Sequence, residues 1–167
     1  MINVTIYRIE NKKRWNGQPE PLPSSPQARW NSGNRQVIYT AESASLAVLE
    51  KLQGSTTASS LGADVFFKQF VLWWIILCFD QPLTEVEPAA LPKDWWKVPA
   101  HRSIDTQRLG NAWLDRNDSL LLKIPSAAVP IGMGWNYLIN PRYPDFKSVI
   151  QQAAVSVTHF DFQYYLS

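Results

Sequence analysis

The strongest constraint on the fold of this chain is one unbroken apolar run, FVLWWIILCF, from Phe70 to Phe79. Lys68 and Asp80 flank the run, which as a helix would be too short to cross about 30 Å of hydrocarbon. A short continuous apolar run is typical of a strand that is buried on both faces. We therefore predict a fully buried strand here, and we expect Cys78 within it to be a core thiol.

The pattern outside this run predicts an α+β fold. Further strands are predicted over residues 4–9, 36–40, 119–124, 137–139, 149–150 and 155–162, although the middle of the region from residue 149 to residue 162 could be helical. Helices are predicted from an N-cap at Ser43 to Leu52, and from Asp105 toward Leu114. Proline-rich or small polar residues indicate loops or irregular segments over residues 11–28, 54–64 and 81–102. Strands and helices do not alternate regularly, and no repeat or composition shift marks a second domain, so residues 1–167 are expected to form one domain.

Charge and cysteine content limit where such a chain acts and what it binds. The formal net charge is +2 at pH 7, which is too small to argue for direct binding of nucleic acid. The cluster Lys12, Lys13 and Arg14 is expected in a solvated loop. The single cysteine excludes an internal disulfide framework, and the first residues lack a secretory signal pattern. We expect a cytoplasmic protein that does not enter a membrane.

The segment from Arg29 to Glu50 carries the clearest chemistry. A polar turn that begins at Arg29 leads into a short strand ending near Tyr39, and a helix carrying Glu50 follows. A cation, an aromatic hydroxyl and a carboxylate suit the binding of an anionic ligand and the stabilisation of a positive charge that develops on it. Glu50 shares one side of its helix with Leu46 and Ala47, which points to a cleft wall; an ordinary exposed helix glutamate is an equal alternative.

Other familiar catalytic patterns are missing. The chain has neither a GxxxxGK[ST] phosphate loop nor a GxGxxG motif. His101 and His159 do not stand at a metal-ligand spacing with the lone cysteine, so a metal site is not expected. A triad of Ser126, His159 and Asp161 can be written, but no GxSxG elbow supports it.

The Arg29–Glu50 segment is one of several blocks that together resemble a known family. In order along the chain, the blocks are Tyr7-Arg8-Ile9, Arg29-Trp30-Asn31 with Tyr39 and Glu50, Gly110-Asn111-Ala112-Trp113-Leu114, Ile124 to Pro130, Asn136 to Pro141, and Pro144-Asp145-Phe146. They cover nearly the whole chain, which resembles the RES domain, the toxin half of RES–Xre type II toxin–antitoxin pairs. The chain departs from the family pattern at Gln27-Ala28, where a glycine is usual, and at Gln163, where an Asp-x-Arg pattern is usual.

The resemblance implies both a fold and an activity. The fold would be that of ADP-ribosyltransferases, with two small, strongly bent sheets that enclose an NAD cleft and helices that flank them. Members of the family cut the bond between nicotinamide and ribose, so NAD would be the substrate, and no cofactor is expected. An Xre-type helix-turn-helix antitoxin would block the cleft and prevent growth arrest.

The resemblance and the chemistry together assign four catalytic residues. Glu50 would stabilise the oxocarbenium-like ribose or hold its hydroxyl or the nucleophile. Arg29 would clamp the pyrophosphate or an acidic nucleophile through its planar guanidinium. Tyr39 would stack on nicotinamide or donate its hydroxyl, and Ser126 would orient the ribose or the carboxamide.

Three more residues are expected at the NAD site. Arg8, on a strand that could line the cleft, is a second candidate for phosphate binding, and a surface position is an equal alternative. Trp30 and Asn31 are expected to shape the pocket. Asn136 and Asn140 are expected to bond backbone groups around a turn.

The sequence leaves several alternatives open. Water, phosphate or a protein side chain could attack the ribose, so the chain could be an NAD glycohydrolase, an NAD phosphorylase or an ADP-ribosyltransferase with a protein target. A non-catalytic module that binds a nucleotide or a partner is a further alternative. Eight tryptophans and a proline-rich middle could cover a homodimer or an antitoxin interface.

Overall fold

A computed structural model describes residues 2–15, 27–54, 63–80 and 82–160. Most of the loops expected over residues 11–28 and 54–64 lies outside these residues, as do Asp161, Gln163 and the end of the strand expected over residues 155–162. Within the described parts of the chain, no helix has both the length and the apolar character needed to cross a bilayer.

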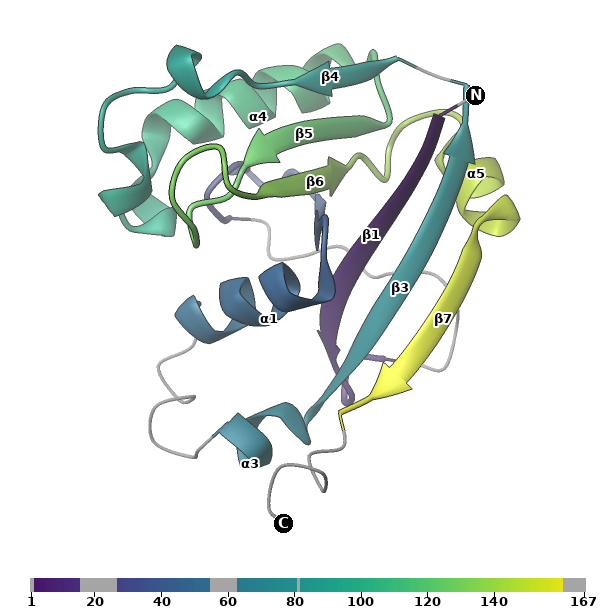
Figure 1. Ribbon diagram of the computed structural model, residues 1–167. Coiled ribbons are helices and arrows are strands. Elements are labelled where there is room, and N and C mark those ends of the chain that lie inside the picture. Colours follow the sequence, from purple (N-terminus) through teal and green to yellow (C-terminus); the bar gives the residue numbers. More distant parts are fainter. Residues whose placement is uncertain (1, 16–26, 55–62, 81, 161–167) are drawn as a thin grey trace.

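Seven strands form the sheet of this mixed α+β fold, which confirms the expected class (Figure 1). They are β1 (Ile2–Asn11), β2 (Ile38–Ala41), β3 (Phe70–Phe79), β4 (Leu83–Glu85), β5 (Leu121–Pro125), β6 (Trp135–Ile139) and β7 (Ala154–His159). Their order in the sheet is β4-β5-β6-β2-β1-β3-β7. Only β4 and β5 run parallel; every other neighbouring pair is antiparallel.

The sheet divides into two halves at its centre. β1 and β3 pair along their whole length, from Ile2↔Phe79 to Asn11↔Phe70. In contrast, β1 and β2 share the single pair Tyr7↔Ala41, which we call the seam. The strands β4–β6 run in a clearly different direction from β1, β3 and β7 in Figure 1. The two bent sheets that the resemblance implied are thus two halves of one seven-stranded sheet, joined at the seam.

The helices pack on different regions of the sheet. Four α-helices are described: α1 (Ala44–Gln53), α3 (Ala63–Phe67), α4 (Ile104–Arg116) and α5 (Phe146–Gln152). Short 3-10 turns occur at Pro88–Ala90, Trp95–Lys97 and Ala100–Arg102. α5 packs on one face of β1 and β3, whereas α1 and α3 pack on the other face. α4 packs on β5 and β6.

The starts of α1 and α4 can be compared with the expected caps. Ser43 is the N-cap of α1, as expected, and its side chain accepts a hydrogen bond from the backbone N–H of Leu46 at 3.2 Å. The N-cap of α4 is Ser103 instead of Asp105. Asp105 lies in the first turn of α4, where a carboxylate interacts favourably with the helix dipole.

Two expectations about strands need correction. Residues 149–150 belong to α5, because Phe146, Val149 and Ile150 follow a helical spacing and form its buried face. β3 is confirmed as a strand but is not buried on both faces: Trp73 is 1% exposed and Trp74 is 46% exposed. Cys78 is also exposed, because α1 and α3 cover this face only around Ile9, Phe70 and Leu72 at the other end of the strand.

Candidate active site

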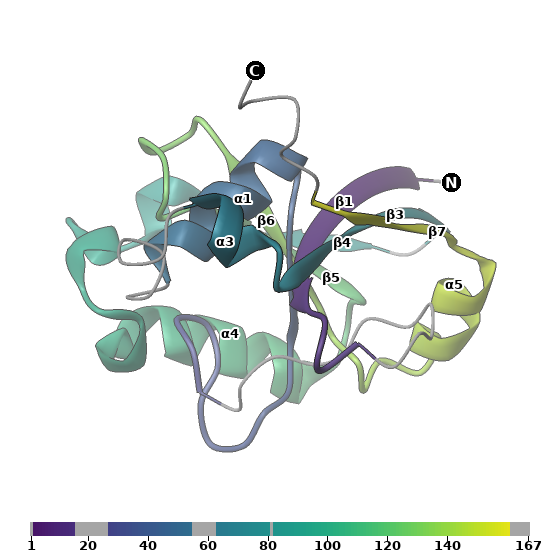
Figure 2. The same ribbon diagram turned by 90° about the horizontal axis from the view of Figure 1, so that it is seen from below.

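A turn over residues 28–32 carries Arg29 and is held in place by α4. Thr106 donates its hydroxyl to the carbonyl oxygen of Arg29 at 2.6 Å, and the amide of Gln107 donates to the carbonyl oxygen of Ala28 at 2.8 Å. In Figure 2 the segment that follows residue 27 lies alongside α4. Both side chains on α4 are buried, so the helix fixes the backbone of the turn from the core side.

A glycine on α4 lets the turn approach closely. A Cβ atom added to Gly110 would lie 1.8 Å from the carbonyl oxygen of Trp30, which is far inside van der Waals contact. The next residue, Asn111, accepts from the backbone N–H of Ser32 at 3.0 Å and donates to its hydroxyl at 2.8 Å. The family-like block that begins at Gly110 therefore acts as the base on which the turn rests.

Tyr39 ties β2 to the same turn. Its hydroxyl donates to Oδ1 of Asn31 at 2.7 Å and accepts from the backbone N–H of Trp30 at 3.0 Å. Burial raises the pKa of Tyr39 above its usual value, so the phenol remains protonated and keeps its role as a donor. Asn31 is fully buried, which makes this a protected hydrogen-bond pair.

The Arg29 guanidinium is anchored on one side only. Nη1 donates to the carbonyl oxygens of Trp95 at 3.2 Å and Val98 at 2.9 Å, and to the hydroxyl of Ser103 at 3.1 Å. Nε and Nη2 make no hydrogen bond to any residue that the structure describes, so this edge can take up an anion. Burial lowers the pKa of Arg29, and the carboxylate of Glu50 acts to raise it. The two side chains are therefore in electrostatic reach of one another.

The carboxylate of Glu50 is held through one of its two oxygens. Oε1 accepts from the hydroxyl of Ser126 at 2.7 Å and from Nδ2 of Asn136 at 2.6 Å. Ser126 is 1% exposed, and its hydroxyl also accepts from the backbone N–H of Ala128 at 2.9 Å. Oε2 has no hydrogen-bond partner in the described part of the chain. Glu50 is thus oriented by its neighbours with one oxygen left to act on a ligand.

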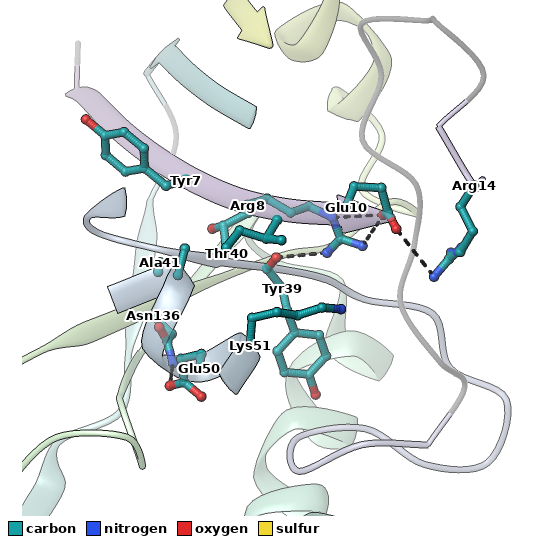
Figure 3. Close-up of a pocket in the computed structure, with 12 residues that line it drawn as sticks. Tyr7, Arg8, Glu10, Arg14, Tyr39, Thr40, Ala41, Glu50, Lys51 and Asn136 are labelled. Carbon is teal, nitrogen blue, oxygen red and sulfur yellow. Dashed lines mark hydrogen bonds and ion pairs between the residues drawn. The ribbon is translucent and has the colours of Figure 1, made fainter. Parts of the chain in front are cut away.

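A cavity of about 320 Å³ lies at the seam and exposes this carboxylate. Its wall consists of residues 7–10 of β1, residues 39–41 of β2, residues of α1 that include Glu50, and Arg14 and Asn136 (Figure 3). Consecutive residues of a strand point to opposite faces of the sheet. The cavity is lined by all four residues 7–10, so it must reach both faces of β1, which is possible only beside the seam, where β1 and β2 are not paired. The cavity exists because β1 and β2 separate there.

Arg8 lines this cavity as expected, but it is also part of the structure of the wall. Its Nη2 forms an ion pair with Oε2 of Glu10 at 2.9 Å, and its Nη1 donates to the carbonyl oxygen of Tyr39 at 2.8 Å. Arg14 approaches Oε1 of Glu10 at 3.8 Å. Arg8 is 7% exposed, and burial lowers its pKa.

The residues predicted from the sequence therefore fall into two groups, those that line the cavity and those that do not. Glu50, Tyr39 and Arg8 line the cavity, whereas Arg29 lies outside its wall. Trp30 is buried against Trp95 with ring centroids 5.8 Å apart; like Asn31, it supports the turn and does not contact the cavity. The hydroxyl of Ser126, expected to orient the ribose or the carboxamide, donates to Glu50, and Ser126 does not line the cavity.

Sequence reasoning missed three residues of the wall. Asn136, expected to bond backbone groups, donates to Glu50, and its Oδ1 is a buried acceptor without a partner among the described residues. The same expectation holds for Asn140, whose Oδ1 accepts a hydrogen bond from the backbone N–H of Arg142 at 3.0 Å. Glu10 and Lys51 were not singled out. The spacing of Glu10 two residues after Arg8 places both on one face of β1 and could have suggested their pairing.

Comparisons with known proteins place this chain among known relatives. The RES domain model matches residues 5–164. A protein named Toxin Res from Yersinia enterocolitica (serotype O:8 / biotype 1B) is 32% identical over 133 residues, which cover 80% of each chain. A protein named Prs ADP-ribosylating toxin from Sphingobium sp. (strain YBL2) is 31% identical over 122 residues, which cover 72% of this chain and 70% of the relative.

A solved structure shares the fold. A chain in the crystal structure of the M. tuberculosis MbcT–MbcA toxin–antitoxin complex matches with a TM-score of 0.67 and 18% sequence identity. The match covers 95% of this chain and 85% of the solved chain. Because the family model spans nearly the whole sequence and a relative exceeds 30% identity over most of its length, this chain belongs to the RES domain family.

Proposed function

We propose that this chain is the toxin of a toxin–antitoxin pair and that it depletes NAD by breaking the bond between nicotinamide and ribose. The names of its relatives support the toxin assignment. The observation that carries the enzymatic part is the carboxylate of Glu50, which Ser126 and Asn136 fix through Oε1 while Oε2 is left available in a cavity.

This carboxylate suits a dissociative cleavage. As the bond between the ribose C1′ and the nicotinamide nitrogen breaks, its electron pair leaves with nicotinamide, which becomes neutral, and positive charge develops on the ribose. A fixed carboxylate next to the sugar stabilises this charge more in the transition state than in the ground state. The oxygen of an acceptor then bonds to C1′ and loses its proton.

The remaining site residues support this step. Ser126 and Asn136 are positioning residues that orient the carboxylate of Glu50. Tyr39 lines the cavity with its ring while its hydroxyl holds the turn, and the free edge of Arg29 offers two donors to an anionic group of the substrate. Arg8 and the cations around it lie farther along the cavity (Figure 3).

Replacement of Glu50 tests the proposal. Glu50→Gln keeps the shape of the side chain but removes its charge, so we expect nicotinamide release to fall by about 10²-fold or more. High-performance liquid chromatography of purified protein with NAD measures this loss. Glu87→Gln, which removes an exposed carboxylate before the 3-10 turn at Pro88–Ala90, is the matched control and should retain activity. Full activity in a folded Glu50→Gln variant would disprove the assigned role.

The acceptor separates three versions of the reaction. Attack by water gives free ADP-ribose, attack by phosphate gives a phosphorylated ADP-ribose, and attack by a protein side chain gives a modified protein. The relative named as an ADP-ribosylating toxin favours transfer to protein as the second candidate. Mass spectrometry of products, with and without phosphate and a cell extract, distinguishes them. NAD binding without nicotinamide release would instead favour a non-catalytic binding module.

The proposed partner is an Xre-type antitoxin that covers the cavity, and the proposed site of action is the cytoplasm. A solved relative in fold is a toxin–antitoxin complex, which supports a protein partner of this kind. Co-expression with an Xre-type antitoxin should yield a complex that does not release nicotinamide. Release at the full rate from such a complex would contradict the idea that the antitoxin blocks the cavity.

A further inference from the structure

The cavity contains a lysine that the reaction described above does not use. Lys51 follows Glu50 on α1, and Figure 3 shows its side chain extending away from the Glu50 carboxylate along the cavity. Its Nζ lies 4.5 Å from the centroid of the Phe70 ring. Lys51 has no ion pair or hydrogen bond through Nζ to any residue that the structure describes.

Cations gather around Lys51 in the part of the chain that the structure describes. Arg8, Arg14 and Lys51 line the same cavity, and Glu10, whose carboxylate both arginines approach, is the described acidic residue at this end. Burial lowers the pKa of Lys51, the nearby arginines lower it further, and Glu10 acts in the opposite direction. A half-buried ammonium group that forms no ion pair with any described residue is unfavourable by itself, so this end of the cavity attracts an anion.

Two structural roles for Lys51 explain only part of this arrangement. A lysine in the last turn of a helix interacts favourably with the helix dipole, and its contact with Phe70 adds a cation–π interaction. Neither role requires two arginines to line the same cavity. Each added cation makes the others less favourable unless a ligand compensates them.

We propose that Lys51, with Arg8 and Arg14, forms a subsite for a phosphate-type oxyanion, and that Lys51 determines the affinity of this subsite. Because this rests on the proposed function, the diphosphate of NAD is the oxyanion that the geometry favours. Successive residues of a helix point about 100° apart. Glu50 and Lys51 therefore direct opposite charges to different parts of one cavity, the carboxylate to the ribose and the ammonium to the phosphates.

Binding measurements without turnover test the subsite. Isothermal titration calorimetry would compare ADP, AMP, adenosine and inorganic phosphate on the wild-type protein and on Lys51→Met and Lys51→Arg. We expect Lys51→Met to weaken ADP binding by about tenfold or more, because a charge-assisted hydrogen bond is lost, while adenosine binding stays unchanged. Lys51→Arg should restore most of the ADP affinity, because the charge remains.

A second lysine provides the control. Lys97 also lies near an aromatic ring, with its Nζ 5.9 Å from the centroid of Trp96, but it is exposed, pairs with Asp94 and does not line the cavity. Lys97→Met should bind ADP like the wild-type protein. Thermal unfolding of each variant confirms that the fold is intact.

The titrations distinguish two sources of the oxyanion, the diphosphate of the substrate and a free phosphate that acts as acceptor. Lys51-dependent binding of ADP that inorganic phosphate displaces only weakly assigns the subsite to the substrate diphosphate. Lys51-dependent binding of inorganic phosphate alone assigns it to an acceptor phosphate and overturns the diphosphate assignment. If neither ligand depends on Lys51, the subsite itself is disproved. ADP binding does not require cleavage, so a protein that binds ADP through Lys51 but leaves NAD intact would disprove only the proposed function.

Discussion

The side chains that hold Glu50 come from two neighbouring strands that lie far from α1 in the sequence. Ser126 follows directly after β5, and Asn136 lies on β6, yet both donate to the same carboxylate oxygen. Oδ1 of Asn136 is a buried acceptor beside the cavity with no partner among the described residues, and a hydroxyl group of a sugar would satisfy it. At this scale the site is a carboxylate oriented by neutral donors, with cations kept farther along the cavity.

Tyr39→Phe tests whether the phenol holds the turn. The substitution leaves Oδ1 of Asn31 and the N–H of Trp30 without their partner, so we expect a loss of about 1–3 kcal/mol in the free energy of unfolding. Urea denaturation followed by tryptophan fluorescence measures it. Tyr137→Phe is the control, because the Tyr137 hydroxyl has no partner among the described residues and should cost little. Equal stability of the two variants would show that the turn does not depend on Tyr39.

At the scale of elements, α4 is the support of the site although it does not line the cavity. Its buried side chains hold the backbone of residues 28–32. Gly110 sets the distance between helix and turn, since any side chain there would meet the Trp30 carbonyl group. A site that depends on Arg29 is therefore sensitive to changes in a helix that no ligand touches.

Gly110→Ala should damage both stability and activity. The added methyl group must displace the turn, and overpacking of this kind costs about 1–3 kcal/mol. We expect a lower melting temperature and a marked fall in nicotinamide release, because Arg29 moves with the turn. Gly54→Ala is the matched control: its φ is −78°, and an added Cβ would approach the Glu50 carbonyl oxygen no closer than 3.4 Å. A Gly110→Ala protein that kept wild-type stability and activity would refute this role of the glycine.

At the scale of the whole molecule, the cavity results from the way the sheet is divided. β1 is fully paired with β3 but meets β2 only at the seam, so its backbone groups on the β2 side have few partners. The cluster under α4 belongs to the half that contains β5 and β6, whereas the cluster under α5 joins Ile6 of β1 to Ile38 of β2 and Ile139 of β6. A ligand that bridges the seam would therefore contact both halves at once.

Hydrogen exchange should show this division. Amides of β1 that bond to β3 should exchange slowly, whereas alternate amides of β1 that face β2 beyond the seam should exchange faster, because they lack a ladder partner. Exchange measured by NMR for residues 6–11 resolves the alternation. Addition of ADP should slow the faster set, while amides of α5, which lies away from the cavity, serve as the reference. Uniform protection along β1 would contradict a divided sheet.

The local patterns predicted most of the elements for physical reasons that can be stated. Ser43 caps α1 because a hydroxyl satisfies a free backbone N–H whatever its tertiary surroundings. The strand over Phe70–Phe79 followed from its unbroken apolar sequence, but its burial did not, because the exposure of Trp74 depends on where other elements end. Residues 149–150 were misassigned because a short β-branched pair fits either structure until its helical partner Phe146 is considered.

Residue types and their order are enough to assign the RES family, the α+β class and the candidate residues Arg29, Tyr39, Glu50 and Ser126. The contacts that these residues make depend on the folded chain. Glu50 meets Ser126 across 76 positions, and no local periodicity encodes a contact over that distance. The place of Lys51 in the cavity likewise follows from the separation of β1 and β2, which is a property of the folded sheet.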